Sequence, residues 1–353
     1  YPDEYIGPGY ELHWTGRYQN WNYMCAECHS TNLVMGYDAT SKTFDTTYSE
    51  LSVGCEACHG PGSEHQSQAV TGTFDDQYGL PVTLDDNDQV AWIMNPETGI
   101  AERSAAITAT SQQPESCGRC HSRRGVIAAE YEYGSPLSHT HMLAYLTQDL
   151  YFADGQIKDE VYVYGSFVQS RMYRAGVTCS DCHNPHSGEL HTGSEPNDVC
   201  AQCHLPSMFA TVEHSKHESS DAACVDCHMA SRTYMGVDDR RDHSFRVPRP
   251  DLSVAIGAPN ACNGCHDDET AAWAATQVAE WFGTDNALRP HVGVAIEAGR
   301  KGGANPVLAD ASANRDFHAI GRATALTLLA PPFNDADFQA ILSALGDPDP
   351  LMR

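Results

Sequence analysis

Fourteen cysteines occur in this chain of 353 residues, and all of them fall in seven C-x-x-C-H motifs. Two thiols three positions apart can each add to one vinyl group of a single haem, and the adjacent histidine can then bind the haem iron. Disulfide frameworks and zinc knuckles also use paired cysteines, but neither requires a histidine after every pair. The pattern therefore predicts seven covalently bound c-type haems. The predicted attachment residues are Cys25, Cys28, Cys55, Cys58, Cys117, Cys120, Cys179, Cys182, Cys200, Cys203, Cys224, Cys227, Cys262 and Cys265, and the predicted proximal iron ligands are His29, His59, His121, His183, His204, His228 and His266.

Eleven further histidines could bind the irons from the opposite face. They are His13, His65, His139, His141, His186, His191, His214, His217, His243, His291 and His318. Seven are needed if every iron has two histidine ligands, an arrangement that leaves no open position for a substrate. The number of spare histidines therefore permits a purely electron-conducting protein without requiring one.

Sequence context favours some of these histidines over others. His65 and His186 follow a motif closely, in loops with glycine or proline that can fold over a neighbouring haem, and His13 lies beside Trp14. Methionine is the other common axial ligand. The methionines near motifs are Met24, Met208, Met229 and Met235. His291 and His318 fall in a helical region, where we expect ordinary surface histidines.

A basic segment surrounds His243. Its arginines, Arg240, Arg241, Arg246 and Arg249, form a cluster in an otherwise acidic chain, and haem propionates are natural counter-charges for guanidinium groups. The prolines of the segment discourage a helix and favour an extended chain. We therefore expect His243 to reach an iron while the arginines hold the segment against propionates.

Two kinds of element must position these residues. Up to about residue 268 the chain is rich in Gly, Pro, Ser, Asn and Asp, which favour loops. We therefore expect a haem-binding domain (residues 1–268) of short helices and long loops wrapped around stacked haems. We also expect one small hairpin in it, from about Tyr78 to Ile100. Porphyrin faces supply most of the apolar core. The predicted fold class is mainly α with much irregular loop.

Residues 269–353 have a different character. Apolar residues recur at helical spacing at Ala274, Val278, Trp281 and Phe282, and again at Phe338, Ile341, Leu342 and Leu345. We interpret both sets as core stripes of helices. The ending A-L-G-D-P-D-P-L-M-R is typical of the turn of a HEAT-type repeat, so we predict a C-terminal α-helical HEAT-like region that stops inside a repeat.

The chain is strongly acidic, with a formal net charge of -26 at pH 7. This charge argues against nucleic acid as a partner and suits both solubility and attraction to basic redox proteins. Because c-type haems are attached outside the cytoplasm, we expect a periplasmic or extracellular protein. The segment that opens at Tyr1 lacks the pattern of a signal peptide, so we expect any export signal to lie outside this numbering. No window of eighteen apolar residues predicts a transmembrane helix.

Four segments carry a family resemblance. They read L-H-W-T-G-R-Y-Q-N-W-N-Y-M-C-A-E-C-H-S-T-N-L, V-G-C-E-A-C-H-G-P-G-S-E-H, V-Y-G-S-F-V-Q-S-R-M-Y-R-A-G-V-T-C-S-D-C-H-N-P-H-S and R-R-D-H-S-F-R-V-P-R-P-D-L. The chain resembles a group of bacterial multihaem cytochromes that often bear tetratricopeptide or HEAT-type repeats, and it is distantly similar to tetrahaem electron carriers of ammonia oxidisers and to octahaem reductases.

The resemblance implies a set of distal iron ligands. These are His13, His65, His141, His186, His214, His217 and His243, with His139 as the substitute if one of them fails. Relatives of this kind carry a further C-x-x-C-H segment before the part that corresponds to Tyr1, so an eighth haem outside this numbering is left open.

Three functions remain open from sequence. The first is an electron conduit, either as a carrier between redox proteins or as the subunit of an extracellular cytochrome filament. The second is a reductase or oxidase of small nitrogen or sulfur compounds with one open haem site. In that case Tyr164, Gln169, Arg171 and Tyr173 would supply proton donors and a cation, although packing and propionate binding also explain them. The third is a scaffold whose helical repeats dock a protein partner.

Overall fold

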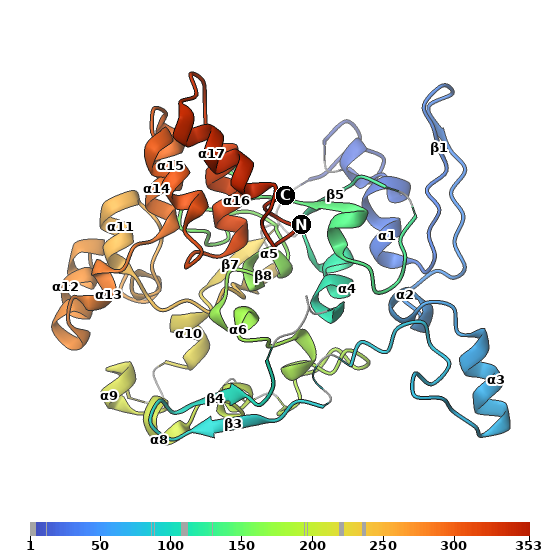
Figure 1. Ribbon diagram of the computed structural model, residues 1–353, viewed down its shortest axis with the longest axis horizontal. Coiled ribbons are helices and arrows are strands. Elements are labelled where there is room, and N and C mark those ends of the chain that lie inside the picture. Colours follow the sequence, from blue (N-terminus) through green and yellow to red (C-terminus); the bar gives the residue numbers. More distant parts are fainter. Residues whose placement is uncertain are drawn as a thin grey trace. The chain divides into compact units, whose positions relative to one another are not determined.

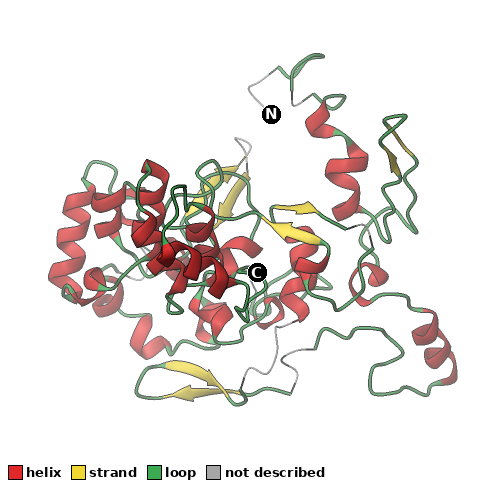
Figure 2. Ribbon diagram, turned by 45° about the horizontal axis from the view of Figure 1, so that its top comes forward, coloured by secondary structure: helices red, strands yellow, loops and turns green. Residues whose placement is uncertain are grey.

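The computed structural model of the chain consists of short helices joined by long loops, with four small two-stranded sheets (Figures 1 and 2). It describes residues 5–11, 13–85, 87, 89–106, 112–128, 130–193, 195, 197–218, 222–234 and 238–353. The prediction of a mainly helical fold with much irregular loop is confirmed. In the described part of the chain, no helix is long and apolar enough to cross a membrane.

The chain divides into two compact units. The first consists of Tyr1–Asp88, Ala109–Met142 and Met235–Val237, and the second of Gln89–Thr108, Leu143–Tyr234 and Asp238–Arg353. The predicted boundary at residue 268 does not coincide with the division between these two units, and it stays a prediction.

The first unit contains few regular elements. Its helical elements are the 3-10 turn η1 (Arg17–Gln19), the π-helical turn η2 (Trp21–Cys25), α1 (Ala26–His29), α2 (Cys55–His59), α3 (Ser63–Thr71), α4 (Gln112–His121) and η3 (Leu137–His139). Its strands are β1 (Tyr37–Asp38), paired antiparallel with β2 (Thr43–Phe44), and β5 (Arg124–Val126), paired with β6 (His141–Leu143), whose last residue belongs to the second unit.

The second unit is richer in helix. Its first part contains α5 (Tyr164–Phe167), α6 (Arg171–Arg174), η4 (Cys179–Asp181), α7 (Asp198–Ala201), α8 (Pro206–Phe209), α9 (Val212–Ser215) and α10 (Cys224–His228). Two antiparallel hairpins, β3 (Trp92–Asn95) with β4 (Ile100–Arg103) and β7 (Ser231–Tyr234) with β8 (Asp238–Arg241), belong to the same unit.

The β3–β4 hairpin corrects the expected position of the hairpin. It spans 92–103 rather than 78–100, because the turn is set by Asn95 and Gly99. The Asn95 side chain accepts hydrogen bonds from the backbone N–H groups of Glu97 and Thr98, and Gly99 takes a φ of 68°, which glycine adopts without strain. The backbone of the hairpin then bonds to the fifth motif, where Ala101 N–H donates to the Cys203 carbonyl at 2.8 Å.

A group of packed C-terminal helices begins just before the last motif. They are α11 (Pro250–Ile256), just before the 3-10 turn η5 (Cys262–Gly264), then α12 (Ala271–Phe282), α13 (Asp285–Leu288), α14 (Val292–Lys301), α15 (Asn305–Ala313), α16 (Ala319–Thr327) and α17 (Asp335–Ala344). Helix α11 packs on α12 and α14, and α15 packs on α14, α16 and α17 (orange to red in Figure 1). Ile296, Leu308 and Ile320 are fully buried among alanines that let these helices approach closely.

The two predicted helix stripes do not form the core. In α17, Phe338, Leu342 and the following Leu345 are 52%, 58% and 64% exposed, whereas Asp337, Ala340 and Ala344 are buried. The buried Asp337 carboxylate accepts hydrogen bonds from Asn305 and from the N-cap Asn334, which turns the large apolar side chains outward.

The stripe of α12 is also only partly buried. Ala274 is covered, while Trp281 and Phe282 at the end of the helix are exposed. Both helices exist as predicted, but the prediction of their buried faces is wrong for these large side chains.

Candidate haem-binding site

Each C-x-x-C-H motif lies on one short helical turn, so its two thiols share one face. The turns are α1 with the preceding η2, α2, α4, η4, α7, α10 and η5. In the motifs that begin at Cys179, Cys200 and Cys262, the N–H of the motif histidine donates to the carbonyl of the first cysteine at 2.8–2.9 Å. The sequence therefore builds the same local geometry at each motif, with the imidazole following directly after the second thiol.

Two motif histidines are held in the orientation of a metal ligand. The Nδ1–H of His59 donates to the Val82 carbonyl at 2.8 Å, and that of His228 donates to the Arg246 carbonyl at 2.6 Å. A carbonyl can only accept a hydrogen bond, so the proton lies on Nδ1 and the lone pair on Nε2. This second hydrogen bond fixes the tautomer and ring direction of metal-binding histidines.

Two pairs of histidines face each other at the spacing that an iron needs. The ring centroids of His214 and His228 are 6.2 Å apart with 17° between their planes, and those of His217 and His266 are 6.0 Å apart with 42°. An iron with a nitrogen at about 2 Å on either side would separate two ring centres by about 6 Å. These residues therefore fit a haem bound to each of the sixth and seventh motifs.

Three predicted distal ligands share the tautomer of His59 and His228. Nδ1 of His65 donates to the Tyr78 carbonyl at 2.7 Å, Nδ1 of His217 donates to the Ser215 carbonyl at 2.7 Å, and Nδ1 of His243 donates to the Arg241 carbonyl at 2.9 Å. In each ring Nε2 is therefore the unprotonated nitrogen, as in a metal-binding histidine.

His141 is arranged differently. Its Nε2 donates to the Glu27 carboxylate at 2.8 Å, Glu27 also pairs with Arg124 at 3.0 Å, and Nδ1 bonds to the Thr140 hydroxyl. Burial raises the pKa of Glu27, but the His141 hydrogen bond and the charge of Arg124 outweigh it and lower that pKa. Both ring nitrogens of His141 are thus engaged in a buried polar network, which does not favour the role that the resemblance implies. The substitute, His139, is exposed in η3.

His13 and His186 also differ from the ligand pattern. The backbone N–H of Thr15 donates to Nδ1 of His13 at 3.3 Å, so the proton of the neutral ring lies on Nε2. His186 is exposed in a turn in which its backbone N–H donates to Asn184. His191 donates through Nε2 to the Ser180 carbonyl at 2.8 Å.

Of the candidate methionines, Met24 and Met208 are exposed, and Met235 lies outside the described residues.

In the first unit, the third motif lies next to both the first and the second. The Sγ atom of Cys28 is 3.8 Å from the Cys120 carbonyl oxygen, and the Arg119 guanidinium donates to the Ala57 carbonyl, inside the second motif, at 3.1 Å. The interaction with Cys120 lowers the pKa of the Cys28 thiol to about 7. The segment after the first motif also contacts the second, since the Asn32 side chain donates to the Glu56 carboxylate at 3.3 Å. The three attachment sites of the first unit therefore lie close to one another.

In the second unit, neighbouring motifs follow the order of the sequence. The Gln202 side chain of the fifth motif donates to the Asp181 carbonyl of the fourth at 3.5 Å. A hydrogen bond with Cys200 lowers the pKa of the Cys224 thiol to about 6. Burial raises the pKa of the Cys227 thiol, and the nearby Cys262 raises it further. Motifs four to seven therefore form a continuous row.

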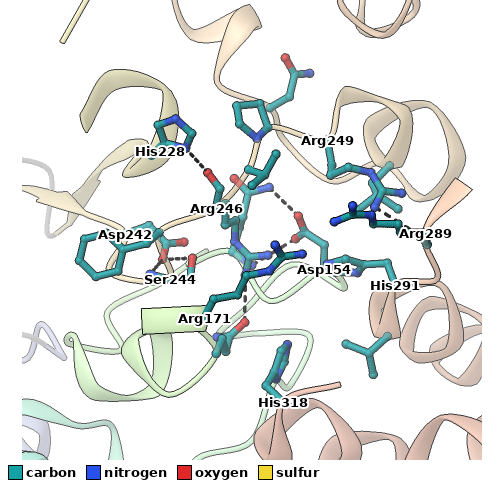
Figure 3. A pocket seen from close by; sticks show the side chains of 18 of the residues that line it. Asp154, Arg171, His228, Asp242, Ser244, Arg246, Arg249, Arg289, His291 and His318 are labelled. Atoms are coloured by element: carbon teal, nitrogen blue, oxygen red, sulfur yellow. Dashed lines mark hydrogen bonds between the residues drawn. The ribbon is translucent and has the colours of Figure 1, made fainter. Parts of the chain in front are cut away.

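Sequence reasoning missed His291 and His318 as site residues. Instead of lying on helix surfaces, they are the N-cap residues of α14 and α16, and their Nδ1 atoms accept hydrogen bonds from Gly293 and Gly321. Both line a cavity whose wall includes His228 (Figure 3). The signal was present in the sequence, because each histidine stands directly before an alanine- and glycine-rich helical segment, where an N-cap belongs.

The four candidate catalytic residues do not all lie at the same cavity. Gln169 and Arg171 line the same cavity as His228, whereas Tyr164 is buried within α5 and Tyr173 packs edge-on against Phe167. The structure therefore brings two of the four together at a haem motif.

Comparison with known proteins agrees with the motif chemistry. Residues 12–60 match the family model described as cytochrome c554 and c-prime. Over 81 residues the chain is 30% identical to the multihaem cytochrome MtrA of Shewanella baltica, an alignment that covers 19% of this chain and 24% of that protein. The chain thus matches only about a quarter of the length of this relative.

Two solved structures are similar in outline. The outer cell wall cytochrome OcwA has a TM-score of 0.45 and 17% identity, covering 91% of this chain and 76% of that one. The undecahaem cytochrome from the S-layer of Carboxydothermus ferrireducens has a TM-score of 0.32 and 18% identity, covering 92% and 56%.

Proposed function

We propose that this chain, a multihaem c-type cytochrome, is an electron-transfer protein that holds seven covalently bound haems. When bound, the haems supply one-electron redox chemistry, which their axial ligands tune. The observation that carries the proposal is the facing of His214 with His228 and of His217 with His266 at about 6 Å. An iron between two imidazoles has no position for a substrate, so this geometry supports conduction.

The fourteen motif cysteines form the thioethers, and the seven motif histidines bind the irons from the proximal side. Ring geometry or tautomer supports His65, His214, His217 and His243 as distal ligands. His186 rests on the resemblance alone. His13 and His141 also rest on it, and their ring hydrogen bonds argue against them.

The spacing of the attachment sites supports a relay within each unit. Motifs one, two and three are neighbours in the first unit, and successive motifs from four to seven are neighbours in the second. Neighbouring attachment sites keep the bound groups close, so an electron can cross each unit in short steps.

The region after residue 268 is proposed to be HEAT-like and to dock a protein partner. Its exposed apolar side chains, among them Phe338, Leu342 and Leu345, are the type that partner surfaces cover. A full-length Leu342→Glu/Leu345→Glu variant should lose a partner that the parent captures, with its haem content unchanged. Equal capture by the two proteins would contradict docking at this face.

The proposal includes export to the periplasm or beyond, where the haems are attached, and exchange of electrons with other redox proteins or with copies of the same chain. A filament would be an ordered assembly in which copies of the same chain exchange electrons. Electron microscopy of the haem-loaded protein tests it, because a filament subunit would appear as an ordered polymer with a fixed repeat. Monodisperse monomers over a wide concentration range would contradict assembly.

A reductase or oxidase is the second candidate, and one observation favours it. Gln169 and Arg171 lie at a cavity beside His228, where they could bind an oxyanion. Against it stands His214, which faces His228 at the distance of a second iron ligand.

Two measurements test the proposal together. The intact mass should exceed that of the polypeptide by seven haems, and the low-temperature EPR spectrum of the oxidised protein should show low-spin irons. A mass excess of six haems or fewer would refute the count. A stoichiometric high-spin signal would favour the enzyme.

A further inference from the structure

A cavity of about 210 Å³ lies in the second unit, beside the sixth motif. Cys227 and His228 form part of its wall, and α14 and α16 contribute His291 and His318 (Figure 3). In Figure 3 the side chains of Asp154, Arg171, Arg246, His291 and His318 converge on the same region. The C-terminal helices therefore contribute directly to the surroundings of a haem motif.

Positive charge is concentrated at this cavity in a chain of net charge -26. Five arginines line it, Arg171, Arg174, Arg246, Arg249 and Arg289, against three aspartates, Asp154, Asp242 and Asp316. Arg249 is paired with Asp251 at 2.7 Å, which leaves four arginines against the three aspartates of the wall. Such an excess favours an anionic ligand.

The buried aspartates are already satisfied by groups other than these arginines. Asp154 accepts hydrogen bonds from the backbone and side-chain nitrogens of Gln156, and Asp242 accepts them from Ile157 and Ser244. Their carboxylates therefore leave guanidinium charge at the cavity without a carboxylate partner.

Arg246 has donors to spare. One of its terminal nitrogens donates to Gln169 at 2.9 Å, and its buried Nε has no hydrogen-bond partner in the described part of the chain. A buried, unpartnered guanidinium nitrogen costs free energy unless it meets an acceptor. Its position in the cavity wall points to an acceptor that enters the cavity.

His291 and His318 add neutral donors. Because Nδ1 of each ring accepts a backbone N–H, at 3.1 and 3.0 Å respectively, the ring proton lies on Nε2. Burial, together with the charges of Arg246 and Arg249, lowers the pKa of His291 to about 3. Burial also lowers the pKa of His318. Both rings stay neutral and present an N–H. The N-termini of α14 and α16, which also favour anions, lie at the same wall.

We propose that this cavity binds an oxyanionic group beside the haem site of Cys224, Cys227 and His228. Arg246 is the central charged donor, and His291 and His318 are neutral donors. The assignment rests on the proposed function, because it requires a haem on the sixth motif. A propionate of a haem held by Cys224, Cys227 and His228 would be one source of such an oxyanion, because a guanidinium group is its natural counter-charge. A small oxyanion from solution is the other.

The test compares the haem-loaded parent with Arg246→Gln and with His318→Asn. Asparagine keeps the N-cap of α16 but removes the Nε2 donor, so this variant tests the donor where the arginine change impairs folding. Arg315→Gln is the control, because Arg315 is exposed and lies outside the cavity wall. Each protein is titrated potentiometrically with EPR detection of individual haems, and the oxidised proteins are titrated calorimetrically with inorganic phosphate.

If a haem propionate fills the cavity, Arg246→Gln and His318→Asn lower the potential of one haem and leave the others unchanged, because loss of a donor or of positive charge destabilises the more negative, reduced state. The parent then binds no phosphate. If the oxyanion comes from solution, the parent binds one phosphate, and Arg246→Gln binds it at least tenfold more weakly. Arg315→Gln matches the parent in both cases.

Unchanged potentials in both variants, together with no phosphate binding by the parent, would overturn the proposal. Peptide mass spectrometry separates this result from failure of the proposed function, because a parent that lacks haem at Cys224 and Cys227 refutes the haem assignment itself.

Discussion

The imidazole of His214 faces that of His228 at 6.2 Å between ring centroids, with only 17° between the ring planes. The two residues come from neighbouring short helices, α9 and α10, and the His228 ring is fixed through its hydrogen bond to the Arg246 carbonyl. This relationship is the most direct sign of a six-coordinate iron in the second unit.

A His214→Ala variant should convert one haem from low-spin to high-spin. The proximal His228 and both thioethers remain, so the haem stays attached while its iron loses one axial ligand. EPR of the oxidised protein counts the change. His191→Ala is the matched control, because His191 donates its Nε2–H to a backbone carbonyl. An unchanged low-spin count in His214→Ala would contradict the pairing.

His243→Ala should have the same effect at a different haem. The Nδ1 of His243 donates to the Arg241 carbonyl, so Nε2 is the unprotonated nitrogen that an iron would bind, and the ring is only partly buried. We expect one haem to become high-spin and to bind carbon monoxide when reduced, with far-UV circular dichroism close to that of the parent. A spectrum without carbon monoxide binding would argue for a basic surface patch with an incidental histidine.

His141→Ala should leave the low-spin count unchanged and reduce stability. Its ring is buried between Glu27 and Thr140, and its removal strands the partly buried Glu27 carboxylate beside Arg124. We expect the free energy of unfolding to fall by about 2 kcal/mol, measured by denaturant titration with circular dichroism. The exposed neighbour in His139→Ala should change it by less than about 0.5 kcal/mol. A new high-spin haem in His141→Ala would restore the ligand role that the resemblance implies.

Asp347→Asn should destabilise the C-terminal helices by about 3 kcal/mol, because Arg322 would lose its partner in a buried ion pair with 2.5 Å between nitrogen and oxygen. Asp310→Asn, on an exposed face of α15, is the control. Thermal unfolding followed by circular dichroism measures both.

The ion pair between Arg322 and Asp347 should make the stability of the protein depend on pH. Burial raises the pKa of Asp347, but the hydrogen bond and charge of Arg322 outweigh burial and hold the pKa below its ordinary value of 3.8. The stabilisation is therefore complete above that value and is lost as the pH falls through the lower, folded pKa. The difference in stability between the parent and Asp347→Asn should shrink below about pH 4. A difference that stays constant down to pH 2 would contradict the ion pair.

The sequence was sufficient for the motifs, because three-residue spacing places both thiols on one turn whatever surrounds them. It could not identify the partners of the motif histidines. Whether His141 meets an iron or Glu27 depends on residues more than a hundred positions away. The helix stripe of Phe338 and Leu342 failed for a related reason, since buried hydrogen bonds of Asp337 set the rotation of α17 against the hydrophobic pattern.

His291 and His318 illustrate a third limit. Their residue type and position before a helix indicate capping, but only the packing of α14 and α16 brings both rings to the cavity of the sixth motif. Composition and periodicity describe a residue's own segment, whereas a site depends on which segments meet.

The position of the third motif in the first unit affects the order in which the chain folds. Contacts that bring the third motif against the first and second join residues 92 and 62 positions apart, whereas those between successive motifs of the second unit join residues 21 and 27 apart. Closing a longer loop costs more chain entropy before any contact compensates for it, and topologies with distant contacts fold more slowly. The second unit, and the first two motifs of the first unit, which are joined by residues 24 positions apart, should therefore assemble early. The third motif should join them later, when α4 packs against both.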